Sequence, residues 1–167
     1  MALIVEDGTD VAGADSYVSE ADAVIIAASL GLSFPTAAES EIPLRLAAIY
    51  LEKYRNRYQG AKVFDDQSLQ WPRNPVYIDK IYNDPAVIPE DLIYAQVVIG
   101  SSISAGANVF GTSFGNTSSK SVGDVSVTIS NGGSSSNAAF MGFVNELLSP
   151  LFNNPENGAL EFTVSRA

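Results

Sequence analysis

Apolar residues recur with the spacing of amphipathic helices in four parts of the chain. The first helix is predicted to begin after Ser19, a cap residue followed by acids, and to end at Gly31. Its apolar stripe is Ala21, Val24, Ile25 and Ala28. The second helix is predicted from Pro43, which suits a first turn, to Gly60. Its apolar face is Leu44, Ala47, Leu51, Tyr54 and Tyr58.

Two further helices follow an irregular stretch at 61–88. The third is predicted to open with Pro89 and two acids, with an apolar face of Leu92, Ala95, Ile99 and Ile103. The fourth runs from about 137 to 149, where Pro150 ends it, and its stripe is Phe140, Phe143, Val144, Leu147 and Leu148. The pattern therefore predicts a mainly α protein, a small four-helix bundle.

The segment between the last two helices has a different composition. From 100 to 136, nineteen of 37 residues are Gly or Ser, which resists compact packing. Residues 125–129 nevertheless alternate as a half-buried strand does. We expect an extended loop or β-hairpin at about 106–136 that pairs with a neighbouring subunit, and a disordered linker is the alternative. The residues expected in this contact are Val122, Val125, Val127 and Ile129.

The C-terminal segment also combines turn-forming residues with a strand pattern. Turn residues at 153–158 precede an alternating strand pattern, and such a strand needs a sheet edge in this chain or in a partner. We divide the chain into a helical domain at 1–152, including the projecting loop, and a C-terminal tail at 153–167. The tail residues expected to bind a partner are Leu160, Glu161, Phe162, Thr163, Val164, Ser165 and Arg166.

Composition narrows the chemistry. The 167 residues include no Cys and no His, which excludes a thiol nucleophile, a Cys/His zinc site and imidazole catalysis. Neither Asp65–Asp66 nor Ser119–Lys120 has the setting that catalysis or metal binding needs, so we expect no enzyme, cofactor or metal. No signal peptide and no membrane span are predicted, and the protein is expected to be soluble and made in a cytoplasm.

Charge is unevenly placed in this chain of net charge −10. Residues 1–44 hold eight acids and no base, whereas residues 45–80 hold seven bases and four acids. The basic segment is either a solvated face with ion pairs to the acidic N-terminal part or a docking face for an acidic partner or a phosphate backbone. Trp71 is either a core anchor or a ring that stacks on a nucleic-acid base beside Arg73.

The order of several segments resembles a known family. These segments are the opening at 3–9 and 14–19, the helix leading to Tyr50–Glu52, Leu69 to Arg73, Ile88–Pro89 before a helix, the strand at 125–127, and 147–151. Together they resemble the head-to-tail adaptor (connector, or head-completion) proteins of tailed bacteriophages, a family often described as DnaT-like single-stranded-DNA-binding proteins. In that resemblance Trp71, Pro72 and Arg73 form a family motif and core anchor.

The resemblance implies a structural protein of the virion neck, assembled in the host bacterial cytoplasm. It implies a ring of about twelve copies under the portal protein, with a projecting hairpin and a C-terminal tail that reaches the portal. The implied partners are further copies of the chain, the portal, and tail or stopper/nozzle proteins, with transient contact to double-stranded DNA. The alternative is a DnaT-like protein that binds single-stranded DNA through Trp71, Arg73 and the basic residues of the second helix.

Overall fold

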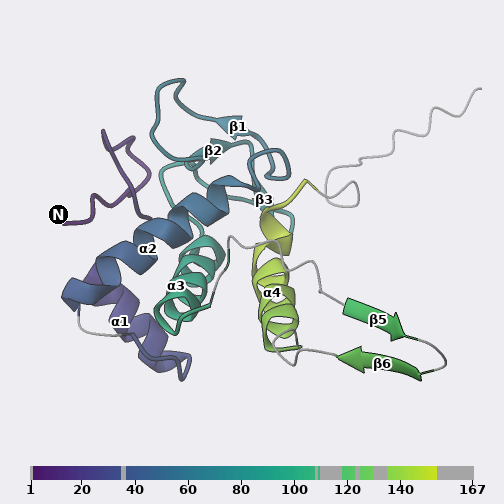
Figure 1. Cartoon of the computed structure of the whole chain (residues 1–167). Helices are drawn as coiled ribbons and strands as arrows, with labels where there is room; N and C mark the ends of the chain where they lie inside the picture. The colour runs from purple at the N-terminus through teal and green to yellow at the C-terminus, as the bar shows by residue number, and fades with distance from the viewer. Residues whose placement is uncertain are drawn as a thin grey trace, which may run out of the picture.

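The computed structural model describes residues 2–34, 37–107, 109, 118–122, 125–129 and 135–153. Four helices form its body (Figure 1): α1 (Glu20–Ser29), α2 (Ala37–Glu52), α3 (Glu90–Ser104) and α4 (Ser135–Leu148). A short 3-10 helix, η1 (Ser149–Leu151), extends α4. The prediction of four helices is confirmed. Within the described residues no helix is long and apolar enough to cross a membrane.

Three antiparallel strand pairs complete the described fold. The pair β1 (Ala61–Lys62) and β2 (Arg73–Asn74) and the pair β3 (Tyr77–Ile78) and β4 (Ile81–Tyr82) lie in the stretch that the sequence pattern left irregular. Each of these strands has two residues, too few for an alternating pattern to be visible. The third pair is β5 (Ser118–Val122) and β6 (Val125–Ile129), and β6 coincides with the predicted strand.

Helix α3 lies at the centre of the helical body, in contact with α1, α2 and α4. Its sequence is apolar on nearly all sides, as expected for a helix surrounded by others. The one large polar side chain in its buried part, Gln96, is fully hydrogen-bonded. Its amide accepts from the Tyr17 backbone N (2.9 Å) and donates to Leu44 O (2.9 Å) and Ser16 Oγ (2.8 Å). Gln96 therefore ties the N-terminal segment, α2 and α3 together.

Helix α1 begins as predicted but buries a different face. The Ser19 side chain accepts a hydrogen bond from the Asp22 backbone N and caps the helix. The buried residues are Ala23 and Ala27, whereas Ile25 from the predicted stripe is largely exposed. The predicted face is wrong because α1 is apolar nearly all round, so its periodicity alone cannot select the side that packs against α2 and α3.

The predicted bounds of α2 are also wrong. The helix begins at Ala37, and Pro43 lies inside it rather than at its first turn. The helix ends at Glu52, eight residues before Gly60, because the following residues leave α2 as hydrogen-bonded turns. Tyr58 still packs in the core, and burial raises the pKa of its phenol, which donates to Leu51 O at 3.0 Å. The apolar residues predicted for this face are therefore correct, but part of the face is formed by the turns after α2 rather than by the helix itself.

Helices α3 and α4 follow the prediction more closely. Helix α3 begins one residue later than predicted, because Pro89 is its N-cap residue rather than its first helical residue. In α4 the stripe residues Val144 and Leu148 are buried, while Phe143 is exposed. The helix ends in η1, where Pro150 lies. The side chain of Phe140 is outside the described set.

Candidate functional site

The two side chains that the sequence offers for contact with a nucleotide, Trp71 and Arg73, are buried. Trp71 is 1% exposed, and its ring meets that of Tyr58 edge-on at a centroid distance of 5.7 Å. Arg73 is 7% exposed, and Pro72 between them is buried as well. A ring in the interior has no free face for a base, so the segment lies in the structure as a core anchor.

The Arg73 guanidinium is occupied within the chain. Its Nε donates to Gln59 O (2.7 Å), its Nη2 to Gly60 O (2.6 Å), and its Nη1 to Gln70 Oε1 (3.0 Å). These hydrogen bonds attach β2 to the turn that follows α2. Arg73 therefore holds β2 against that turn, and its donors are used by two backbone oxygens and one side-chain oxygen of this chain.

The other predicted contact residues lie away from this core. Val122 is the last residue of β5, and Val125, Val127 and Ile129 belong to β6. The register pairs Val122 with Val125 and Ser118 with Ile129. In Figure 1 the hairpin extends beyond α4, away from α1. The predicted tail residues Leu160 to Arg166 lie outside the described residues, as does most of the predicted loop at 106–136.

One ion pair supports the interpretation of the basic segment as a solvated face that pairs with the acidic N-terminal part. Arg45 Nε lies 2.6 Å from Asp15 Oδ2, so a base of α2 does pair with the acidic N-terminal part. Other bases of the segment are placed differently. Lys62 Nζ donates to Gln67 O at 2.9 Å, and the Lys53 ammonium lies over the Tyr50 ring at 4.5 Å.

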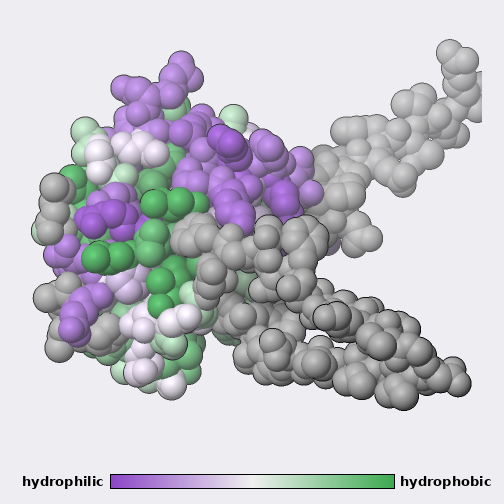
Figure 2. All heavy atoms as spheres, in the orientation of Figure 1, coloured by the Kyte–Doolittle hydropathy of each residue, from purple (hydrophilic) through white to green (hydrophobic). Residues whose placement is uncertain are grey.

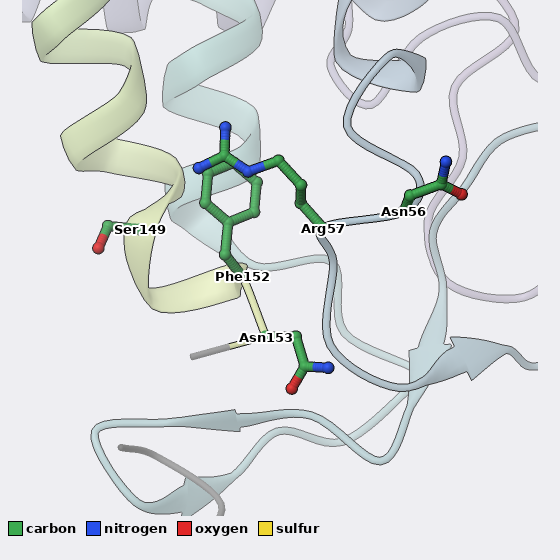
Figure 3. A pocket seen from close by; sticks show the side chains of 5 residues that line it. All are labelled: Asn56, Arg57, Ser149, Phe152 and Asn153. Atoms are coloured by element: carbon green, nitrogen blue, oxygen red, sulfur yellow. The ribbon is translucent and has the colours of Figure 1, made fainter. Parts of the chain in front are cut away.

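A pocket that the sequence pattern did not indicate lies where the turn after α2 meets the end of α4. It has a volume of about 410 Å³ and is lined by Asn56, Arg57, Ser149, Phe152 and Asn153. Figure 3 shows the Arg57 guanidinium stacked on the Phe152 ring, and its carbon lies 4.1 Å from the ring centroid. The same carbon lies 5.5 Å from the centre of the Tyr54 ring.

Backbone hydrogen bonds fix the two walls of this pocket against each other. The Asn153 backbone N donates to Arg57 O at 2.6 Å, and Tyr58 and Phe152 form an antiparallel bridge. The buried Gln59 side chain links a third element, because its Nε2 donates to both Pro150 O (2.7 Å) and Tyr77 O (3.0 Å). The lining residues that face each other are 92 to 97 positions apart in sequence, so no local motif indicates the pocket.

The β3–β4 hairpin beside η1 exposes aromatic and apolar side chains. Tyr77 and Tyr82 meet edge-on with ring centroids 5.8 Å apart, and Ile81 is 72% exposed. Elsewhere Ile25, Ile42 and Ile49 are exposed on α1 and α2. Figure 2 shows hydrophobic residues reaching the surface over the helical side of the molecule and hydrophilic residues gathered over the loops.

Two buried titratable groups in the described part of the chain have shifted pKa values. Burial raises the pKa of Glu52 above its ordinary value, an effect opposed by hydrogen bonds from Gln70 and Tyr17. The pKa of Tyr17 is raised well above its ordinary value, also by burial. No group of three or more acids lies close enough to hold a metal ion among the residues that the structure describes.

A family model described as "Putative DnaT-like ssDNA binding protein" matches residues 1–167, the whole chain. The chain belongs to this family. No curated protein and no solved structure matches it. The description of the DnaT-like family names binding of single-stranded DNA and no place in a virion, so the adaptor function stays a prediction. For this member of the DnaT-like family, the described structure places Trp71 and Arg73 in the interior and Arg57, Tyr77 and Tyr82 at the surface.

Proposed function

We propose that the protein is a structural adaptor of the tailed-bacteriophage neck. In this proposal copies of the chain form a ring that joins the portal of the head to tail or stopper/nozzle proteins. The finished ring lets DNA pass through its channel.

The observation that carries the proposal is the β5–β6 hairpin, which extends beyond the helical body (Figure 1). In the described fold its two strands form a two-stranded sheet of five residues each. A two-stranded hairpin is marginally stable by itself in water. Its outer edges carry backbone donors and acceptors that a strand from another chain can satisfy. A ring supplies such a chain to every subunit in turn.

Charge supports the same function. A net charge of −10 repels the phosphates of passing DNA, whereas a basic channel would bind them. A ring around DNA works only if the duplex slides through it.

The test is assembly with a portal protein of a tailed bacteriophage. The full chain is expected to attach to purified portal rings as a ring visible by electron microscopy, and to co-purify with intact particles. Deletion of 160–167 should abolish attachment while the circular dichroism of the helical body stays unchanged. Particles that are complete without this chain would overturn the proposal.

A second candidate is the single-stranded-DNA binding that the family description names. Its stacking surface would be Tyr77 and Tyr82, since Trp71 has no exposed face. A fluorescent oligo-dT probe measures it: micromolar affinity that Tyr77→Ala and Tyr82→Ala remove would establish this function, and absence of binding at low salt would exclude it.

A further inference from the structure

The Arg57 guanidinium presents donors that the described chain does not use. The guanidinium contacts the faces of the Phe152 and Tyr54 rings. Stacking occupies the flat faces of a guanidinium and leaves its edge, with N–H groups in a planar fork, available to an acceptor. Among the described residues no carboxylate forms an ion pair with Arg57.

The surrounding pocket adds neutral hydrogen-bonding groups to this charge. Asn56, Ser149 and Asn153 line it, and none of the described residues that line it is acidic. Arginine with amide and hydroxyl donors is the usual composition of a site for a planar oxyanion, and a carboxylate matches the fork of the guanidinium with two parallel hydrogen bonds. The volume of about 410 Å³ admits a whole acidic side chain together with part of its own backbone.

The pocket is also held in place before any ligand arrives. The Asn153 to Arg57 backbone hydrogen bond and the three-way contacts of Gln59 fix the turn, η1 and β3 relative to one another. The stacked ring holds the guanidinium, so little side-chain freedom remains to be lost on binding.

We propose that the Arg57 pocket binds a carboxylate from the acidic segment 1–44 of a second copy of this chain. The inference rests on the proposed ring, since it names one of its contacts. Charge complementarity identifies the occupant: that segment holds eight acids and no base, and Asp7 and Asp22 in it are exposed. In Figure 1 the N-terminal segment and α1 lie at the left, and the end of α4 lies well away from them. Two different patches on separate faces make a head-to-tail contact, the type of contact that forms a ring when the rotation between neighbours closes.

A phosphate has similar chemistry, but the observations favour the carboxylate. A chain of net charge −10 repels a polyphosphate backbone as a whole, whereas a local contact between its basic turn and its own acidic segment brings opposite charges together. Nucleic-acid binding at this pocket is therefore the rival outcome of the test.

The absence of cysteine makes a clean cross-linking experiment possible. One full-length protein carries Asn56→Cys at the pocket rim, and a second carries Thr9→Cys or Ala21→Cys beside the exposed acids. Mixed under mild oxidation, they are expected to form the mixed disulfide dimer. Adding Arg57→Glu to the first protein should slow this cross-linking by about tenfold or more, because an unpaired or repelled carboxylate no longer docks.

Arg55→Glu is the matched control. Arg55 is exposed in the same turn and does not line the pocket, so its reversal changes the net charge equally and should leave the rate within about twofold. Arg57→Lys keeps the charge without the planar fork and should give an intermediate rate. Thermal melts of each variant verify folding, and the lysine variant serves if the glutamate variant does not fold.

Each result distinguishes the proposed carboxylate contact from its alternatives. Equal rates for Arg57→Glu and the parent, or an equal loss in Arg55→Glu, would overturn the proposal. If Arg57→Glu cross-links normally but loses affinity for oligo-dT, the pocket binds phosphate, and the proposed carboxylate contact is overturned as well. If the parent attaches to the portal and Arg57→Glu forms the same rings, only this contact is refuted. If the parent itself does not attach to the portal, the adaptor function is refuted.

Discussion

Replacement of Trp71 is the most direct test of the fold and of the conclusion that this buried ring does not stack on a nucleotide. The side chain is 1% exposed and lies in the main core cluster beside Tyr58. A buried tryptophan removes up to about 250 Å² from water. At about 25 cal/mol per Å² the transfer free energy is about 6 kcal/mol as an upper bound. Truncation of buried aromatic residues in cores costs about 3–5 kcal/mol, and we expect this loss for Trp71→Ala.

Trp71→Phe separates the contribution of ring packing from that of the indole N–H group. The indole Nε1 is buried and has no hydrogen-bond partner among the described residues. Phenylalanine keeps most of the apolar contact and removes that donor, so the loss of unfolding free energy should be only about 1–2 kcal/mol. Against a total stability of about 5–15 kcal/mol, the alanine variant should lose a large share of the stability and the phenylalanine variant only a small one.

Urea denaturation followed by far-ultraviolet circular dichroism measures both values. Trp71 is the only tryptophan, so its fluorescence in the parent protein also reports directly on this site. Its emission should be blue-shifted, protected from acrylamide and unchanged by oligo-dT. A cost below about 1 kcal/mol for Trp71→Ala, or quenching of Trp71 by the oligonucleotide, would refute the reasoning that this ring is a core anchor.

Two further predictions concern a buried carboxylate and a backbone turn. Burial raises the pKa of Glu52, so the native state binds a proton at higher pH than the unfolded chain does, and stability falls as pH rises from the ordinary glutamate value through the folded one. Glu52→Gln keeps the Oε1 acceptor for the Gln70 backbone N and should remove that part of the decline, as urea unfolding at several pH values measures. Gly60→Ala should cost about 3 kcal/mol in a thermal melt, because the residue has φ +60° and an added Cβ would lie 2.5 Å from Pro75 O.

Each of these has its own control. Gly31 has a similar φ of +69°, and no atom of the described residues lies within 4 Å of an added Cβ, so Gly31→Ala isolates the backbone effect and should cost only about 1–2 kcal/mol. Equal costs at the two glycines would contradict the close approach at Gly60. For Glu52, the decisive quantity is the difference between variant and parent, since Asp91 also has a raised pKa from burial and nearby acids. An unchanged pH profile in Glu52→Gln would show that Glu52 does not cause the decline.

The residues of the candidate site show what sequence reasoning can reach. The hairpin was foreseen because alternation in β6 stands out from a Gly- and Ser-rich background. The pocket was not, because Arg57 and Phe152 are 95 positions apart and meet only when the turn after α2 packs against η1. The basic residues of segment 45–80 are visible in the sequence as charge, but charge alone does not separate Arg57 in a pocket from Arg45 in an ion pair.

By itself the sequence determined the local features: the capped start of α1 at Ser19, the start of α3 after Pro89, the strand β6 and the uneven charge. These follow from backbone donors, side-chain caps and periodicity within a few residues. Only the tertiary structure decided which face of α1 is buried, that Trp71 and Arg73 are interior, and that Arg57 lines a pocket. Burial and pocket walls depend on partners far away in the chain, because an apolar or charged side chain is enclosed only by what packs against it.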